Sequence, residues 1–260
     1  MEKLSTLGTT NTETLEITEL TNNILIQEPF IQVSNSNIEA LSFSTSTTPT
    51  VSDWSVYTGP VIHQGTCGSC YAAATVQTVE ALYSYYLFNG TYFKLSIQQI
   101  IDCANSGFDG CLGGWLQSSY QFIEDYGLTT HFVYPYNSGT SGAGQTCLYP
   151  EGGQFVIGGY ITIINSCTTI RSILNSRPVS VGISAAPLQL YSSGTFDECV
   201  DSQVIIDHAV VIVSHSETKG WRIKNSWGTA WGEDGFAWII DDDQKNCGLC
   251  RMAAAPFLSN

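Results

Sequence analysis

The densest chemical signal in the sequence is the segment Gln64-Gly65-Thr66-Cys67-Gly68-Ser69-Cys70-Tyr71, which leads into a stretch with helical apolar spacing. Cys70 would then lie at the N-terminus of that helix, where the backbone dipole favours an anion. A thiol becomes a strong nucleophile at low pH only when a helix terminus and a neighbouring imidazolium depress its pKa. This chemistry therefore needs a histidine that the fold holds close to Cys70.

The sequence offers such a histidine far along the chain. His208 lies in the apolar run Asp207-His208-Ala209-Val210-Val211, which predicts a strand where an unpaired imidazole would be costly. The next predicted strand leads into Lys224-Asn225-Ser226-Trp227-Gly228. There Asn225 provides an amide that could orient the imidazole, and Trp227 provides an indole that could shield this contact from water.

These motifs, in this order, resemble the active-site signature of papain-like cysteine proteases, and of the cathepsin L-like endopeptidases among them. The resemblance spans about residues 51–257 and implies a role for each motif residue. Cys70 is similar to the nucleophile that attacks a peptide carbonyl and forms a thioester, and His208 to the general acid that protonates the leaving amine. Asn225 would orient His208, and the Gln64 side-chain amide would join the backbone N–H of Cys70 in an oxyanion hole.

Two residues near the expected nucleophile are unusual for the family. Tyr71 stands where most members of the family have Trp, so the packing beside the thiol is expected to differ. His63 directly precedes Gln64 and is interpreted as a solvated loop residue, which could add a titration near pH 6, the ordinary range for histidine.

The segment Cys111-Leu112-Gly113-Gly114-Trp115 resembles the family's strand that pairs with the substrate backbone. Because glycine has no Cβ, an extended peptide can lie close to Gly113 and Gly114. The resemblance also implies a pocket without charge for the side chain two residues before the scissile bond, so Leu, Phe or Val is expected there rather than Arg. The residues expected to line it are Trp115, Leu116, Gly182, Ile206, Ala209 and Met252, with Trp227 nearby in the substrate site.

Two function classes remain open, and the sequence favours one of them. Between Gly114 and His208 there is no His-rich insertion that could cap a cleft and hold a C-terminal carboxylate, which favours an endopeptidase over a carboxydipeptidase. The alternative is a catalytically silent, protease-like binding protein. Since Cys70, His208, Asn225 and Gln64 are all present, we expect an active enzyme.

The chain contains nine cysteines, a high and odd number. Eight could pair and leave one free thiol, which indicates disulfides and an oxidising compartment. Spacing alone does not decide how they pair. The family resemblance implies Cys67–Cys111, Cys103–Cys147 and Cys199–Cys247, and we assign the remaining Cys167 and Cys250 to an extra bridge.

Other polar clusters have plainer interpretations. Cys67-x-x-Cys70 could be a thioredoxin-like redox pair, but no early βαβ pattern surrounds it, and Cys247-x-x-Cys250 could be half of a zinc site, but no second close pair is found. His131 and His215 are expected at the surface, and Asp241-Asp242-Asp243 in a solvated turn. We therefore expect neither a metal nor a cofactor.

Composition narrows the range of partners. Nine Lys and Arg against 23 Asp and Glu give a net charge of -14, which leaves too few cations for a nucleic-acid-binding or membrane-surface face. We expect protein and peptide substrates, cystatin-like inhibitors and a monomer. The expected location is lysosomal, vacuolar or secreted, although residues 1–30 lack the apolar run of a signal peptide.

The elements that must position these residues change character along the chain. Helical patterns come first and β-branched or aromatic runs follow, which predicts an α+β protein. The resemblance implies a two-lobed papain-like fold, with a mainly helical lobe over about 51–150, a β-barrel-like sheet lobe over about 151–260 and the active-site cleft between them. Residues 1–50 are rich in Ser and Thr and are interpreted as a disordered tail or as a pro-region remnant with a linker. Predicted helices are 70–88, 96–103 and 116–126; predicted strands are 154–164, 179–183, 204–213, 221–224 and 235–240.

Overall fold

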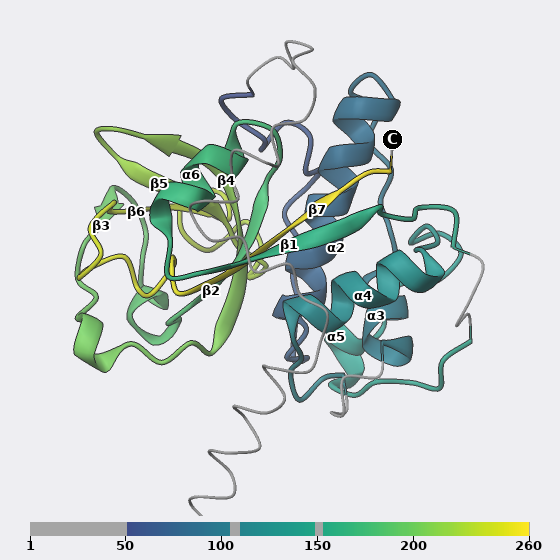
Figure 1. The fold of residues 1–260 in the computed structure, drawn as a ribbon. Helices are drawn as coiled ribbons and strands as arrows, with labels where there is room; N and C mark the ends of the chain where they lie inside the picture. Colours follow the sequence, from purple (N-terminus) through teal and green to yellow (C-terminus); the bar gives the residue numbers. More distant parts are fainter. Residues whose placement is uncertain (1–50, 105–109, 149–152, 260) are drawn as a thin grey trace, which may run out of the picture. The chain divides into compact units, whose positions relative to one another are not determined.

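The structure is a computed structural model that describes residues 51–104, 110–148 and 153–259. The Ser/Thr-rich segment 1–50, interpreted above as a tail or a pro-region remnant, lies outside the described residues. Figure 1 shows the helices and strands of the described part.

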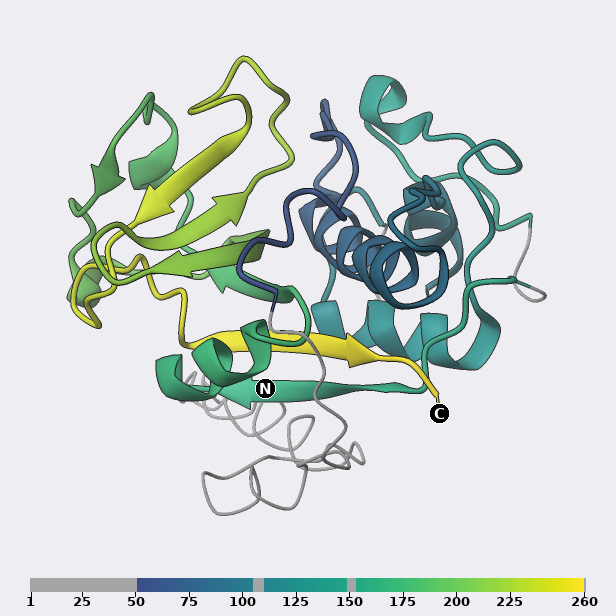
Figure 2. The same ribbon diagram turned by 90° about the horizontal axis from the view of Figure 1, so that it is seen from above.

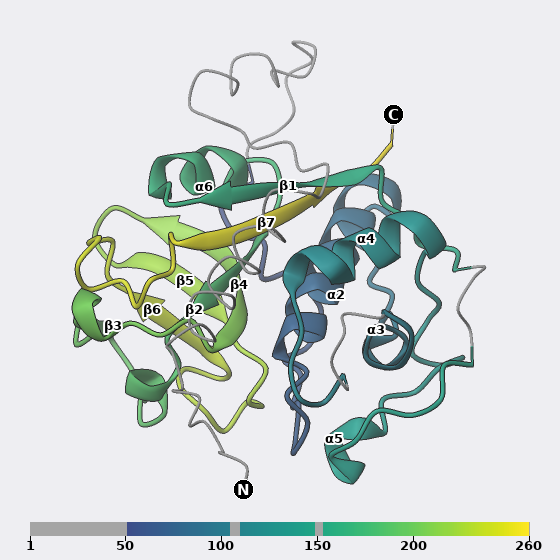
Figure 3. The same cartoon turned by 60° about the horizontal axis from the view of Figure 1, so that its bottom comes forward.

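The first half of the described chain is helical. Every residue of α2 from Tyr71 to Leu82 is buried, because α2 lies between the sheet and the other helices (Figures 1 and 3). Several of its polar side chains hydrogen-bond within the helix, as when the Thr75 hydroxyl donates to the Tyr71 carbonyl oxygen at 3.0 Å. The helices of this half are α2 (Cys70–Leu82), the π-helical turn η2 (Tyr83–Leu87), α3 (Ile97–Cys103), α4 (Leu116–Tyr126) and α5 (Ser138–Ser141).

The second half builds one sheet whose strand order is β1-β7-β2-β4-β5-β6-β3. Its neighbouring strands are antiparallel except for β3 and β6, which are parallel. The helix α6 (Cys167–Leu174) packs on β2 and β4. The strands are β1 (Gly159–Ile164), β2 (Val179–Ile183), β3 (Thr195–Phe196), β4 (His208–Ser216), β5 (Gly220–Lys224), β6 (Phe236–Ile239) and β7 (Met252–Phe257), with short turns η3 (Ala186–Leu188) and η4 (Asp201–Gln203).

Strands β1 and β7 connect the sheet to the helical half. They pair along their whole length, from Gly159 opposite Phe257 to Ile164 opposite Met252, and α4 packs on both (Figure 2). No helix of the described part combines the length and the apolar character that a membrane crossing requires.

Several predicted boundaries were wrong, and one strand was missed. The predicted strand 154–164 begins only at Gly159, and the predicted strand 204–213 begins only at His208, after the turn η4. The first helix changes to a π-helical turn after Leu82. The sequence patterns missed β7 because its run of small alanines has little β-propensity, so its pairing with β1 determines its conformation.

The prediction that His215 is a surface turn residue was also wrong. His215 lies in β4 with a side chain that is 9% exposed, its Nε2 is 2.8 Å from a carboxylate oxygen of Asp241, and its ring centroid is 4.5 Å from that of Trp221. Asp241 also pairs with Arg171 and accepts from Trp221 Nε1 at 2.9 Å. Asp241 is therefore an anchor between elements rather than a merely solvated residue.

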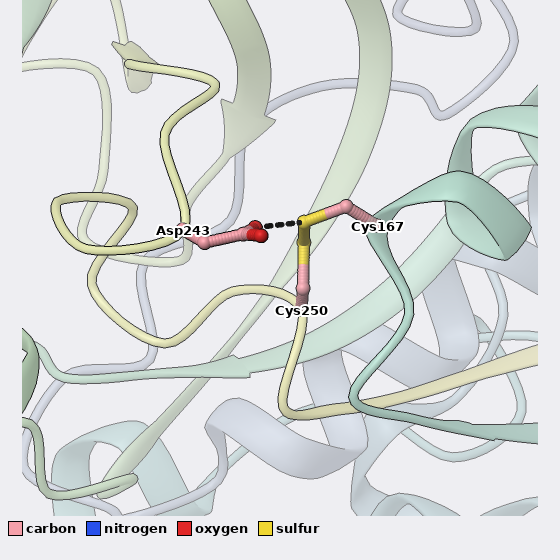
Figure 4. Close-up of side chains that lie close together, drawn as sticks. All are labelled: Cys167, Asp243 and Cys250. Carbon is pink, nitrogen blue, oxygen red and sulfur yellow. Dashed lines mark hydrogen bonds between the residues drawn. A yellow bond between two sulfur atoms is a disulfide. The ribbon is translucent and has the colours of Figure 1, made fainter.

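The eight cysteines pair as expected from the resemblance and from the extra bridge assigned to the remaining two. Figure 4 shows the extra bridge with the Asp243 carboxylate directed at it, 3.1 Å from the Cys167 sulfur. Because sulfurs joined in a disulfide carry no thiolate charge, these three residues do not offer the soft anionic ligands that a metal would need. The four disulfides are Cys67–Cys111, Cys103–Cys147, Cys167–Cys250 and Cys199–Cys247.

Candidate active site

Cys70 is the first residue of α2 and, in the described part of the chain, the one cysteine without a disulfide partner. The preceding residue, Ser69, does not cap the helix, because its hydroxyl is engaged with the Tyr136 hydroxyl at 2.7 Å. No acidic side chain lies in the first turn either. The first N–H groups of α2 are therefore left to interact with the thiol.

Opposing effects act on the Cys70 thiol. Burial raises its pKa, and the charge of Asp207 raises it further, whereas backbone N–H groups of Ala209, Tyr71 and Cys70 lower it. Burial likewise lowers the pKa of the His208 imidazole. A single charge on either group is thus unfavourable here. A thiolate and an imidazolium held close together would stabilise each other, so a proton transfer between the two is chemistry that this arrangement could support.

His208 is the first residue of β4, which brings it to the start of α2. The thiol of Cys70 interacts with the backbone N–H of Ala209, the residue directly after His208. His208 Nε2 is 2.8 Å from Asn225 Oδ1, and that same oxygen accepts from the backbone N–H of Ser226 at 2.8 Å. Because Asn225 Oδ1 can only accept, Nε2 of His208 carries a proton, and Nδ1 is the ring nitrogen that is left to accept one.

Trp227 covers the contact between His208 and Asn225. Its ring centroid is 4.8 Å from the imidazole centroid, with 30° between the ring planes. Trp231 packs edge-on against Trp227, with centroids 5.2 Å apart. The apolar cover excludes water, which strengthens the hydrogen bond that orients the imidazole.

The Gln64 side chain is held at both ends of its amide. Its Nε2 donates to the carbonyl oxygen of Cys67 at 3.0 Å, and its Oε1 accepts from the Ser226 hydroxyl at 2.7 Å. Its backbone N–H also donates to the Ser226 carbonyl oxygen at 2.8 Å. Since one hydrogen on Nε2 is not used by the Cys67 contact, the amide can donate it to a developing oxyanion near Cys70.

The sequence matches the model of the family described as "Papain family cysteine protease" over residues 48–257. The chain belongs to the papain family. It is 32% identical over 207 residues to a cathepsin L-like proteinase of Phaedon cochleariae (77% of this chain, 62% of that protein), and 32% identical over 216 residues to one of Fasciola hepatica (80% and 65%). The chain thus spans less than two thirds of the length of these curated relatives.

Solved structures of the papain family agree in fold. A Carica candamarcensis cysteine protease, solved in complex with E-64, superposes with a TM-score of 0.72 at 30% identity, covering 82% of this chain and 100% of that one. The bromelain protease of Ananas comosus, also solved with E-64, gives 0.69 at 30% identity, with the same coverage. The predicted two-lobed α+β papain-like fold is confirmed.

The predicted substrate strand shows why a papain-family chain can carry Tyr71 beside its thiol. A Cβ on Gly114 would lie 2.5 Å from the Tyr71 ring, so this glycine makes room for the tyrosine. The Tyr71 hydroxyl donates to the Gly110 carbonyl oxygen at 3.0 Å. A Cβ on Gly113 would meet no described atom within 4 Å, so that glycine is the one with open space above it.

Four of the six predicted pocket residues lie together. A Cβ on Gly182 would lie 2.5 Å from Ile206 and 3.1 Å from the Met252 side chain, and Gly182 pairs with Ala209 across β2 and β4. The other two differ from each other in exposure. Trp115 is 51% exposed, whereas Leu116 is 2% exposed and belongs to the hydrophobic core, so Leu116 has almost no surface to offer a peptide.

Sequence reasoning missed a buried charged pair behind the papain-family motif residues. Lys224, directly before Asn225, is fully buried and donates to the Thr58 and Gly59 carbonyl oxygens at 2.8 Å and 2.6 Å. The Glu80 carboxyl group, on α2, accepts from the backbone N–H of Leu95 and from the Tyr92 hydroxyl. Burial raises the pKa of Glu80 to about 8 and lowers that of Lys224 to about 8, and each charge partly offsets the other's shift. A lysine inside an apolar strand was the signal that could have revealed this pair.

Replacing Lys224 with Met is expected to lower the free energy of unfolding by about 1–3 kcal/mol or more, the usual cost of leaving buried acceptors without a donor. The variant leaves two carbonyl oxygens without their donor and removes one of the two lysine charges that lower the pKa of Glu80. Urea unfolding measures the change. The exposed Lys245→Met variant is the control, and a Lys224→Met variant as stable as this control would contradict the role assigned to the pair.

Proposed function

We propose that this protein is a cysteine endopeptidase that hydrolyses peptide bonds through a thioester at Cys70. One observation carries the proposal: the uncapped start of α2 holds a free thiol beside the backbone of Ala209, while Asn225 orients the adjacent His208. This combination supplies a nucleophile, a proton carrier and a fixed ring orientation in one place.

The proposed reaction follows from these groups. Proton transfer from the Cys70 thiol to His208 Nδ1 gives a thiolate, which attacks the peptide carbonyl carbon. The oxygen of that carbonyl becomes an oxyanion, which accepts from the Gln64 amide and the backbone N–H of Cys70. His208 then gives its proton to the leaving amine, the C–N bond breaks, and the thioester remains. Water, deprotonated by the neutral imidazole, hydrolyses the thioester and restores the thiol.

Replacing Gln64 with Ala is expected to lower kcat by about 10²–10³-fold and to change KM little, because the lost donor acts on the oxyanion rather than on the bound substrate. Steady-state hydrolysis of a fluorogenic peptide measures both constants. Ser226→Ala, which removes only the hydroxyl that holds Gln64 Oε1, is the matched variant and should show a smaller loss of kcat. A Gln64→Ala variant with unchanged kcat would exclude the proposed oxyanion hole.

We expect a substrate with Leu or Phe two residues before the scissile bond to be cleaved at least about tenfold more efficiently than one with Arg there. The gathered residues Gly182, Ile206, Ala209 and Met252 carry no charge that could pair with a guanidinium. Dipeptide amides with Phe, Leu or Arg at that position, compared by kcat/KM, test the proposed activity and the pocket together. No hydrolysis of any of them would argue for the silent binding protein, and preference for Arg would overturn only the pocket.

The disulfides and the proposed active site also indicate a cellular location and binding partners. Four disulfides are typical of an oxidising compartment, which supports a lysosomal, vacuolar or secreted location. The proposed partners are protein and peptide substrates and cystatin-like inhibitors, which would bind the monomer at the site around Cys70. Papain-family relatives solved with E-64 support inhibitor binding at this kind of site.

A further inference from the structure

A cavity of about 330 Å³ lies beside the segment that leads to Gln64, and the proposed reaction does not use it. One wall is the apolar stretch 60–62, and the rest includes His63, Lys94 and His131 together with two tyrosines. The backbone N–H of His131 donates to the Lys94 carbonyl oxygen at 2.8 Å, which holds these two residues side by side.

Three nitrogen-bearing side chains in this cavity have N–H groups that are not engaged in hydrogen bonds. Among the described residues, no hydrogen bond or ion pair engages the Lys94 ammonium or the His131 ring. His63 Nδ1 accepts from the backbone N–H of Gly65 at 2.9 Å, so a neutral His63 ring carries its proton on Nε2. These three side chains are therefore the groups that could donate to a ligand.

The other polar groups around the cavity are already engaged. The Tyr92 hydroxyl donates to Glu80, and the Tyr136 hydroxyl donates to the Gln64 carbonyl oxygen at 2.6 Å. Glu80 lies behind Tyr92, is itself fully buried and accepts from the backbone N–H of Leu95.

The charged side chain that lines the cavity, Lys94, is opposite in sign to the net charge of the protein, and its charge also acts on the buried Glu80. The chain has a net charge of -14, yet the described residues that line the cavity include one lysine and two histidines and neither Asp nor Glu. A group of unengaged N–H donors in an acidic protein suits the binding of an anion. The volume of the cavity is at the lower end of the range for small-ligand sites.

We propose that this cavity binds an oxyanion, held by Lys94, His63 and His131. The shared chemistry is that of a phosphate or carboxylate group, which could belong to a free anion or to an acidic residue of a bound peptide. His63 forms an isolated β-bridge with Trp227, the residue that covers His208, so the cavity lies next to the site of the proposed reaction. The second of these sources rests on the proposed function, whereas binding of a free anion does not.

The test uses the full chain with Cys70→Ala, which cannot digest itself, and inorganic phosphate as the probe. The chain has four histidines, whose ring signals can be followed by NMR while phosphate is titrated at constant ionic strength. The His63 and His131 signals should shift saturably, whereas those of His208 and His215 should not. Lys94→Met should weaken binding by about tenfold or more, while Lys219→Met, which removes an exposed cation lying over Trp238, should leave it unchanged.

Three results would contradict anion binding in this cavity. Shifts that do not saturate, equal shifts of all four histidines, or unchanged binding in the Lys94→Met variant would overturn the proposal. A second experiment, on the active enzyme, distinguishes a free anion from an acidic residue of a bound peptide. Its substrate is a peptide that carries Glu on the leaving side of the scissile bond. Competition by phosphate against this peptide, but not against its Gln counterpart, supports the peptide source, and saturable binding without competition supports the free anion.

Discussion

Replacing Cys70 with Ala should abolish peptide hydrolysis, with a loss of kcat on the order of 10⁶-fold, the scale seen when a catalytic nucleophile is removed. No other thiol can substitute for it, because the other eight cysteines are paired in disulfides. Hydrolysis of a fluorogenic dipeptide amide with Phe two residues before the bond measures the loss.

The fold should survive this substitution, because alanine is a strong helix former and the following residues of α2 remain buried. Urea unfolding of the variant is the control. Thr66→Ala on the same segment removes a hydroxyl that donates to the Gly139 carbonyl oxygen at 3.1 Å, and this variant should keep most of the activity. Residual hydrolysis by Cys70→Ala within tenfold of the unaltered chain would show that another group attacks the substrate.

Replacing His208 with Gln is expected to cost nearly as much activity and, in addition, to change the pH dependence of the thiol. With His208 present, the thiolate forms by proton transfer to the imidazole, so alkylation of Cys70 should be rapid well below the ordinary pKa of a thiol. Without it, burial raises the pKa of Cys70 above its ordinary value, so the thiol stays protonated at neutral pH and becomes reactive only at high pH. The rate of iodoacetamide alkylation against pH measures this change.

A matched comparison separates this effect from a general disturbance of the site. In an Asn225→Ala variant the imidazole remains but loses its orienting acceptor, so the alkylation profile should keep its acidic limb while kcat falls. If His208→Gln left the rate of alkylation at acidic pH unchanged, the thiolate would not depend on this imidazole.

The chemistry of the site was easier to predict from the sequence than its supporting structure. Cys70 and His208 lie in short segments where residue types alone indicate a reactive thiol and a partner for it, and the helix begins at Cys70 as expected. The pairing of Glu80 with Lys224 could not be predicted in this way. A lysine in an apolar strand indicates a buried charge, but the residue that faces it comes from a different element, and neither local pattern identifies it.

In the fold as well, elements determined by local sequence were predicted, whereas elements determined by distant segments were missed. Strand β2 has the predicted bounds because its β-branched residues alternate within a fully buried run. Strand β7 and helix α6 were missed, since alanine-rich and threonine-rich segments carry weak local preferences. Their conformations depend on pairing and packing with segments far away in the chain, such as β1 for β7 and β4 for α6.

The most direct test of the central proposal is to trap the covalent intermediate. A peptide ester is mixed with the enzyme, the reaction is stopped with acid within its first turnovers, and the protein is digested and analysed by mass spectrometry. We predict that the acyl group of the substrate is attached to the peptide that contains Cys70, and that the attachment is absent in Cys70→Ala. Turnover of the ester with no acyl group on Cys70, or with the group on another residue, would contradict the proposed thioester mechanism.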